Sequence, residues 1–514
     1  MQQDTSANNK RIAKNTLFMY FRMFFTMCVS LYTSRVVLAV LGFSDYGLYN
    51  VVGGVIAMFG FLNGAMSNMT SRFITYYLGQ NNYERLSEVF SMAFFIHCGI
   101  ASLIIILGES IGLWFFYHKM VIPEDRLIAA LCIYQFSIAS TVMMIISVPF
   151  TSDIIAHEKM SVYAYISIVD SVLKLIIVYF LAYAPFDKLI FYGLLLFGIH
   201  VLNFLFNLLY CRWHFVESKI HKVWNKNLLK EMSKFTGWSL FGNFSHVFYT
   251  QGLNLLLNMF CGPIVNAARG IAVQIEAAMT QFTSNIQTAI NPQIIKSYSQ
   301  DNIQRTKTLI FASSKYCFFL MLLLSLPVML GADFILGVWL KEYPEHTVNF
   351  LRLTLMCVLL DTLVNPMYTA NLATGKVAIY NKRLAILSIT FIPITYLAIK
   401  ITHLPEIVFM LNVLRNIIGI GIRMFIIRSQ LGIGIHEYCQ KVIVRIFVVT
   451  AIATLISLFV VHGMGIDSFA KFSLITAIST LSVLMAAFGM GLNHQERSFV
   501  ITKSKAFILS HINH

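Results

Sequence analysis

The chain has 514 residues, of which 57% are hydrophobic and only 12% are charged, and its mean hydropathy is +0.71. This composition excludes a soluble globular protein and predicts an all-α integral membrane protein, because the apolar runs lack the alternation of a membrane β-barrel. The formal net charge of +15 needs no nucleic-acid partner, since basic residues beside a membrane face anionic lipid.

Fourteen apolar segments long enough to cross a membrane follow one another along the chain. A transmembrane helix needs about 20 apolar residues. We expect these helices to begin near residues 12, 44, 86, 124, 160, 188, 233, 264, 308, 346, 380, 405, 440 and 468. The first, from about Phe18 to Leu41, resembles a secretory signal in position, but it is too long and no small-residue cleavage site follows it.

The first helix carries polar residues on one face. Arg22, Thr26, Ser30 and Thr33 recur at steps of four, four and three, whereas Arg35 lies off this face toward the expected external end. Polar and charged groups are costly in lipid unless they face a cavity or a partner. The pattern therefore favours a cavity-lining role for this face, while Arg35 either lines a cavity or extends to the interface.

A basic stretch between the sixth and seventh helices divides the chain. We predict an N-terminal six-helix lobe at 1–211, a cytoplasmic linker at 212–234, a C-terminal six-helix lobe at 235–430, accessory helices 13 and 14 at 431–492, and a basic cytoplasmic tail at 493–514. The linker is either an amphipathic segment lying on the membrane or a plain connector held near the surface by its charges.

Two helices after the linker carry longer polar stripes. On the seventh helix the stripe consists of Asn243, His246, Thr250, Asn254 and Asn258; on the eighth it consists of Arg269, Glu276, Thr280, Thr283, Gln287 and Asn291. Their spacing of three, four or seven residues places each stripe on one helix face. We expect the stripes to line a wet central cavity between the lobes. The alternative for Arg269 and Glu276 is mutual neutralisation, since buried charges prefer partners.

Landmark residues of the first half recur 217 to 225 positions later. The segment 80–85 (QNNYER) reappears as 300–305 (QDNIQR), and Gly42 corresponds to Gly262 at the same offset of 220. The triplet 112–114 (GLW) corresponds to 337–339 (GVW), and Pro149 with Lys159 corresponds to Pro366 with Lys376. Because all these matches keep the same order, they predict two homologous lobes.

The basic residues indicate the orientation of the chain. Cytoplasmic loops retain Lys and Arg. With the N-terminus inside, the loops and tails hold 25 basic residues on the cytoplasmic side and 6 on the external side. Both termini are therefore predicted to be cytoplasmic. Within the helices, Asp170 and Lys174 lie four residues apart, which favours a structural ion pair.

No catalytic constellation is present in the sequence. There is no phosphate-binding loop with its lysine, no nucleophile elbow and no large soluble loop, so we expect neither an ATPase nor another enzyme, and no cofactor. The eight cysteines are scattered singly and the fourteen histidines lack metal-ligand spacing, so no disulfide framework or metal site is indicated. A membrane glycosyltransferase or polymerase is the enzyme-class rival, although the external loops are short for one.

At several places the chain resembles the multidrug/oligosaccharidyl-lipid/polysaccharide (MOP) exporter superfamily, and within it the O-antigen flippase type of polysaccharide transporter. The resemblance covers nearly the whole chain. It is carried by Arg35 with 40–42 (VLG) and 45–49 (DYGLY), by 71–72 (SR) with 78–80 (LGQ), and by the two Pro-to-Lys helix endings. It implies the MATE-like fold, with two six-helix bundles that open a central cavity alternately to each side of a bacterial inner membrane.

The resemblance also implies the substrate, a polyprenyl-diphosphate-linked oligosaccharide moved from the cytoplasmic to the external leaflet. Arginine suits a diphosphate because its planar fork binds phosphate oxygens bidentately. We therefore expect Arg22 and Arg269, then Arg35, to bind the diphosphate. The glycan-contacting candidates are Thr26, Ser30, Asn243, His246, Thr250, Asn254, Asn258, Thr280, Thr283 and Gln287, and Glu276 is the candidate for ion coupling.

The remaining expectations concern partners and alternatives. The protein is expected to act as a monomer in contact with membrane lipid, beside a polysaccharide polymerase and ligase. A lipid II flippase shares the anionic cargo and the fourteen helices, so the sequence separates it poorly from an oligosaccharide flippase. A cation-coupled multidrug exporter needs carboxylates in its cavity, and Glu276 is the single carboxylate on the polar stripes.

Overall fold

The structure is a computed structural model of the 514-residue chain. It describes the backbone of all residues except 1, 58–65, 68, 72, 75–76, 79, 81, 158, 184, 186, 222–224, 375, 494–495 and 499–514. Side chains are further left undescribed at 2–23, 55–57, 160, 182, 231, 233–243, 284–286, 288–289, 292, 296, 299 and 377.

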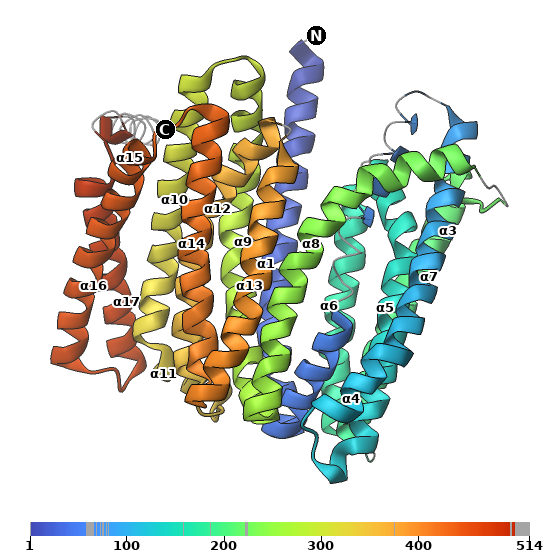
Figure 1. The fold of residues 1–514 in the computed structure, drawn as a ribbon, viewed down its shortest axis with the longest axis horizontal. Helices are drawn as coiled ribbons and strands as arrows, with labels where there is room; N and C mark the ends of the chain where they lie inside the picture. The colour runs from blue at the N-terminus through green and yellow to red at the C-terminus, as the bar shows by residue number, and fades with distance from the viewer. Residues whose placement is uncertain are drawn as a thin grey trace. The chain divides into compact units, whose positions relative to one another are not determined.

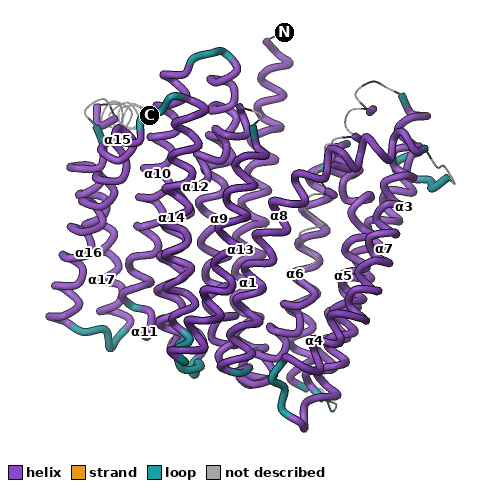
Figure 2. Tube along the Cα trace, in the orientation of Figure 1, coloured by secondary structure: helices purple, strands orange, loops and turns teal. Residues whose placement is uncertain are grey.

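Helices make up nearly all of the described chain, and no strand occurs in it (Figures 1 and 2). The helices are α1 (Gln2–Ala57), α3 (Tyr83–Leu107), α4 (Leu113–Lys119), α5 (Leu127–Ala156), α6 (Met160–Ala182), α7 (Lys188–His214), α8 (Lys226–Cys261), α9 (Pro263–Ser299), α10 (Ile303–Leu330), α11 (Ala332–Leu340), α12 (Thr347–Thr374), α13 (Val377–Thr402), α14 (Glu406–Leu431), α15 (Ile435–Tyr438), α16 (Val444–Met464) and α17 (Phe469–Ala486).

The predicted all-α membrane fold is confirmed. Each of the fourteen predicted segments coincides with a helix over its described residues; the first two lie in the single bent helix α1, the second of them as far as Ala57. Eleven helices in the described residues are long and apolar enough to cross a membrane. The chain is therefore a multi-pass membrane protein.

The internal repeat is seen in the backbone conformation as well as in the amino-acid sequence. Gly42, inside α1, has φ 77° and ψ 174°, and Gly262, between α8 and α9, has φ 79° and ψ −180°. Asn82 and Asn302 each cap a helix by accepting a bond from a backbone N–H three residues later, at 3.1 and 3.0 Å. Such matched corners and caps support the prediction of two homologous halves.

The chain folds into two compact units. Unit 1 contains Met1–Ile271, Tyr343–His346 and Ala385–Val408, and unit 2 contains Ala272–Glu342, Thr347–Leu384 and Phe409–His514. In unit 1, α5 packs against α3 and α7, and the aromatic ring of Phe150 meets those of Phe90 and Phe204. The domain boundaries expected from the sequence stay a prediction.

In unit 2, α10 packs against α12, and α16 and α17 form an adjacent pair (Figure 1). Buried Lys315 on α10 donates to both carboxylate oxygens of Glu496 at 2.8 and 2.7 Å. Burying a lysine is costly unless it is paired, so this bond fastens the start of the C-terminal tail to α10. The helices predicted as accessory, α16 and α17, also pack against α10, and their accessory role stays a prediction.

An ion-pair network joins three segments of unit 1. Arg126, just before α5, donates from Nε to Asp45 of α1 at 2.8 Å and from Nη1 to Asp187 at 2.6 Å. Asp187 also caps α7 by accepting from the N–H groups of Leu189 and Ile190. Burial opposes ionisation of Asp187, but the bonds from Arg126 and from the backbone outweigh it and hold its pKa below the ordinary value.

This network predicts a pH dependence of stability. Because the folded-state pKa of Asp187 is depressed, its ionised form stabilises the protein above about pH 4, and that contribution is lost as pH falls through the folded-state pKa. In thermal unfolding between about pH 5 and 3, Asp187→Asn should lose less stability than the wild type. Asp125→Asn, which neutralises an exposed neighbour, should behave like the wild type; equal slopes for wild type and Asp187→Asn would contradict the assignment.

Candidate functional site

Asparagine side chains gather where α1, α8 and α9 meet in unit 1. Asn266 of α9 donates from Nδ2 to the backbone oxygen of Asn254 at 2.8 Å and to its Oδ1 at 2.7 Å. Asn254 donates in turn to the backbone oxygen of Asn50 at 3.2 Å, and Asn50 donates to that of Tyr46 at 2.8 Å. We call Asn50, Asn254 and Asn266 the amide cluster; it joins three helices by hydrogen bonds in an apolar setting.

One turn along α8, Asn258 forms a second polar connection. Its Oδ1 accepts from the backbone N–H of Val121 at 3.0 Å, and its side chain is fully buried. Val121 lies in the loop between α4 and α5. Asn258 therefore holds this loop against α8 instead of presenting its amide on an accessible surface.

Arg269 lies one helical turn from the amide cluster on α9. Its Nη2 donates to the backbone oxygen of Thr250 on α8 at 3.0 Å, and the residue is half-buried. A guanidinium has five N–H donors in a planar fork. The bond to Thr250 fixes one edge of this fork, so the position of the cation is set by the α8 backbone.

Close backbone contact between α1 and α9 makes this arrangement possible. A Cβ atom at Gly47 would overlap the backbone carbonyl of Pro263, and a Cβ at Gly270 would lie 2.7 Å from Nδ2 of Asn50. Only glycine lets the two helices approach so closely. Asn50 and Asn266 consequently lie within reach of the same α8 segment.

The other predicted residues of α1 and α8 differ in accessibility. Ser30 and His246 are exposed, whereas Thr26, Arg35 and Thr250 are half-buried. Asn254 is only 2% exposed. The predicted stripe on α8 thus runs from an accessible end at His246 to a buried end at Asn258. The side chains of Arg22 and Asn243 lie outside the described residues.

The predicted residues of the later part of α9 belong to unit 2. Glu276 and Thr280 are half-buried, and Thr283 and Gln287 are buried. Thr280 donates to the backbone oxygen of Glu276 at 2.9 Å, and Thr283 donates to that of Thr280 at 3.1 Å. These bonds satisfy the threonine hydroxyls within the helix itself.

Two members of the amide cluster are absent from the residues predicted from the sequence. These are Asn50 and Asn266, and a helical pattern was available for Asn266, which lies three residues before Arg269 and thus on the same face of α9. The expected pairing of Lys174 with Asp170 is confirmed at 2.7 Å, and Asn203 of α7 also donates to Asp170. That charge pair is structural, as the spacing indicated.

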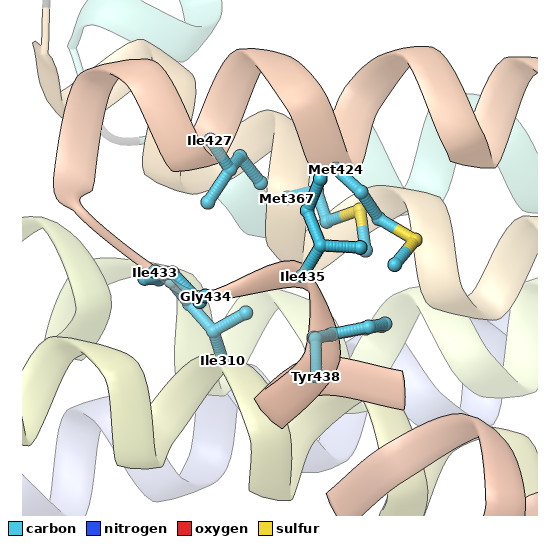
Figure 3. Close-up of a pocket in the computed structure, with 8 residues that line it drawn as sticks. All are labelled: Ile310, Met367, Met424, Ile427, Ile433, Gly434, Ile435 and Tyr438. Carbon is cyan, nitrogen blue, oxygen red and sulfur yellow. The ribbon is translucent and has the colours of Figure 1, made fainter. Parts of the chain in front are cut away.

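Unit 2 contains a small pocket that is lined mainly by apolar side chains, unlike the amide cluster. Figure 3 shows its lining by Ile310, Met367, Met424, Ile427, Ile433, Gly434, Ile435 and Tyr438. These residues come from α10, α12, α14 and the segment that leads into α16. The lining is almost entirely apolar, so it offers no recognition of a charged or sugar-containing ligand.

The fold of the chain is similar to that of several proteins of known structure. No protein-family model matches the chain, and no curated protein matches it. A structure of the lipid II flippase MurJ in an inward closed conformation matches with a TM-score of 0.69 at 14% identity, covering 92% of this chain and 98% of that one. An inward-facing multidrug resistance MATE family transporter of the MOP superfamily matches with a TM-score of 0.67 at 15% identity, covering 79% and 94%.

The chain has the fold of the MOP superfamily transporters. A further transporter of that superfamily, from Pyrococcus furiosus, matches with a TM-score of 0.55 at 14% identity and covers 82% of this chain and 96% of that one. The expected MATE-like fold is thereby confirmed. At 14–15% identity the likeness shows the fold and does not identify the cargo.

Proposed function

We propose that the protein is a flippase that moves a polyprenyl-diphosphate-linked oligosaccharide from the cytoplasmic to the external leaflet by alternating access. The observation that carries this proposal is the extent of the structural matches. The likeness to a lipid II flippase spans 92% of the chain, whereas that to the MATE family transporter spans 79%. This difference in coverage supports a lipid-linked glycan as the cargo over a cationic drug.

The charge of the candidate site agrees with an anionic cargo. Arg269 is half-buried next to the amide cluster, with its orientation set by the Thr250 backbone oxygen. A diphosphate requires cationic donors, and hydrogen bonds between a guanidinium and phosphate oxygens are charge-assisted and frequently bidentate. In this proposal Arg269 binds the diphosphate together with Arg22, and Arg35 of α1 provides a further cation.

Uncharged polar groups supply the proposed glycan contacts. Ser30, His246 and Thr250 are the more accessible candidates on α1 and α8, and Thr26 and Thr280 are half-buried. Asn254 and Asn258 take part in hydrogen bonds between segments of unit 1, so we assign them first to holding the site in shape. Thr283 and Gln287 are buried and contribute only if the site opens around them.

A lipid II flippase is the second candidate, and the match to the MurJ structure supports it as well as the first. It shares the diphosphate and differs in the glycan. A multidrug exporter is less favoured, since cationic drugs need carboxylates and the polar stripes carry only Glu276. Glu276 is retained as the candidate for ion coupling.

The cellular setting follows from the same proposal. We place the protein as a monomer in the bacterial inner membrane with both termini in the cytoplasm, because basic residues are concentrated on that side. A polymerase and a ligase that use the translocated glycan would be its functional partners.

Reconstitution tests the proposed function. Purified protein in liposomes that contain a fluorescent polyprenyl-diphosphate oligosaccharide should make the inner-leaflet label accessible to a membrane-impermeant quencher. Protein-free liposomes and a polyprenyl-monophosphate lipid are the controls. Movement of lipid II alone would select the second candidate, and uptake of cationic dyes without lipid movement would assign the protein to drug export.

A further inference from the structure

Two carboxylates and an imidazole that do not belong to the polar stripes meet at the end of α5. We propose that Asp153, His157 and Glu217 bind a divalent transition-metal ion of the zinc class, which fastens the segment between α7 and α8 to α5. Asp153 lies in α5, His157 directly follows this helix, and Glu217 lies in the short turn Val216–Ser218. This site is independent of the proposed flippase function.

The geometry of the three groups suits a single ion. Their potential ligand atoms all lie within 4.8 Å of one another. His157 Nε2 lies 2.6 Å from Glu217 Oε1 and 3.7 Å from Asp153 Oδ1. Ligands about 2.0–2.2 Å from a tetrahedral zinc ion lie roughly 3.5 Å apart, so small side-chain rotations place all three around one ion.

Burial leaves the charges of this group poorly compensated. The Asp153 side chain is fully buried and that of Glu217 is 3% exposed, whereas His157 is 20% exposed. Within the part of the chain that the structure describes, neither Asp153 oxygen has a hydrogen-bond partner. One imidazole balances at most one of the two carboxylates, and an unpaired buried carboxylate is costly. A bound dication would supply the missing positive charge and a bonding partner for the carboxylate oxygens of Asp153.

The surroundings keep the imidazole in position. The His157 ring stacks on Phe215, with 4.0 Å between centroids and 6° between planes. An oriented histidine inside an apolar shell is typical of metal sites. A nitrogen ligand favours zinc-class ions over calcium and magnesium, which prefer oxygen ligands alone. His157 is the most exposed of the three side chains, so an ion would reach the buried carboxylates past this imidazole.

The internal repeat indicates that this site belongs to the first half alone. At the offset of 217 that relates Pro149 to Pro366, Asp153 and His157 correspond to Ala370 and Thr374, which cannot form the same ligand set. The proposed ion therefore acts asymmetrically: it restrains the connection after α7, and the second half lacks an equivalent.

Cobalt binding tests the proposal directly. Full-length purified protein, stripped with a chelator, should bind one equivalent of Co²⁺ with the visible absorption of a tetrahedral site, and Zn²⁺ should displace it. Asp153→Asn and Glu217→Gln should each weaken binding at least about tenfold. The matched control is His214→Gln. His214 is exposed, and the hydrogen bond of its ring is to the backbone oxygen of Tyr210.

Two results would overturn the proposal, and the first of them does not depend on any variant being folded. Absence of stoichiometric Co²⁺ binding by the folded wild type would overturn it and favour a proton shared among the three groups. Equal binding by the wild type and Asp153→Asn would also overturn it. Zn²⁺ should raise the unfolding temperature of the wild type and of His214→Gln, and this shift should be absent in Asp153→Asn.

Discussion

Replacing Arg269 by alanine is expected to lower the rate of glycan-lipid translocation by about 100-fold or more. Two hydrogen bonds to a charged group contribute roughly 3 kcal/mol together, which corresponds to about a 100-fold change. The expected loss follows if the guanidinium binds the diphosphate from its position beside Thr250. The measurement is the initial rate of lipid translocation in liposomes at equal protein content.

Two further variants show whether the charge of Arg269 or the planar shape of its guanidinium is required for translocation. Arg269→Lys keeps the charge but loses the planar fork, so an intermediate rate is expected. Arg85→Ala removes an exposed arginine that pairs with Glu88 on the surface of α3, so it should translocate at the wild-type rate. Unfolding temperatures show whether loss of the Thr250 bond destabilises Arg269→Ala. Full activity in both Arg269→Ala and Arg22→Ala would refute the arginine assignment.

Substituting alanine for Gly47 is expected to destabilise unit 1 by about 3 kcal/mol or more. The added Cβ would overlap the Pro263 carbonyl, and a backbone atom cannot rotate away as a flexible side chain can. Overpacking typically costs about 1–3 kcal/mol, and the cost is larger when backbone must shift. Thermal unfolding in detergent and the yield of folded protein measure the effect.

Gly53 provides the matched control in the same helix. A Cβ at Gly53 would meet no atom within 4 Å. Alanine is also a better helix former than glycine by about 0.5–1 kcal/mol, so Gly53→Ala should be neutral or slightly stabilising. If both variants unfolded at the same temperature, the close contact between α1 and α9 would not be what requires glycine at position 47.

Much of the fold can be predicted from local sequence patterns, namely apolar segments and repeated residues. Apolar segments fix the helices, and the repeated letters around Asn82 and Asn302 correspond to matching helix caps. The stretch 212–234 predicted as a linker contains two helix ends, since α7 continues to His214 and α8 begins at Lys226. Helix ends depend on capping and on tertiary contacts, which hydropathy does not register.

The candidate site was less accessible to sequence reasoning. Helical spacing placed Thr250 and Asn254 on one face of α8, and that face does meet α9 through Arg269 and Asn266. Spacing along a single helix cannot tell whether an amide faces a cavity or a neighbouring helix. It also cannot bring together residues such as His157 and Glu217, which are 60 positions apart in the chain and 2.6 Å apart in space.

The backbone at Gly42 and Gly262 has a consequence for handedness. A φ near +78° with an extended ψ is essentially restricted to glycine, yet a Cβ at either position would meet nothing within 4 Å. The obstacle to a side chain is thus chirality and not volume. The preferred backbone angles of a D-alanine mirror those of its L-form, so this backbone suits a D-residue, whereas every L-residue is strained at both corners. Two positions 220 residues apart should therefore have the same narrow tolerance to mutation.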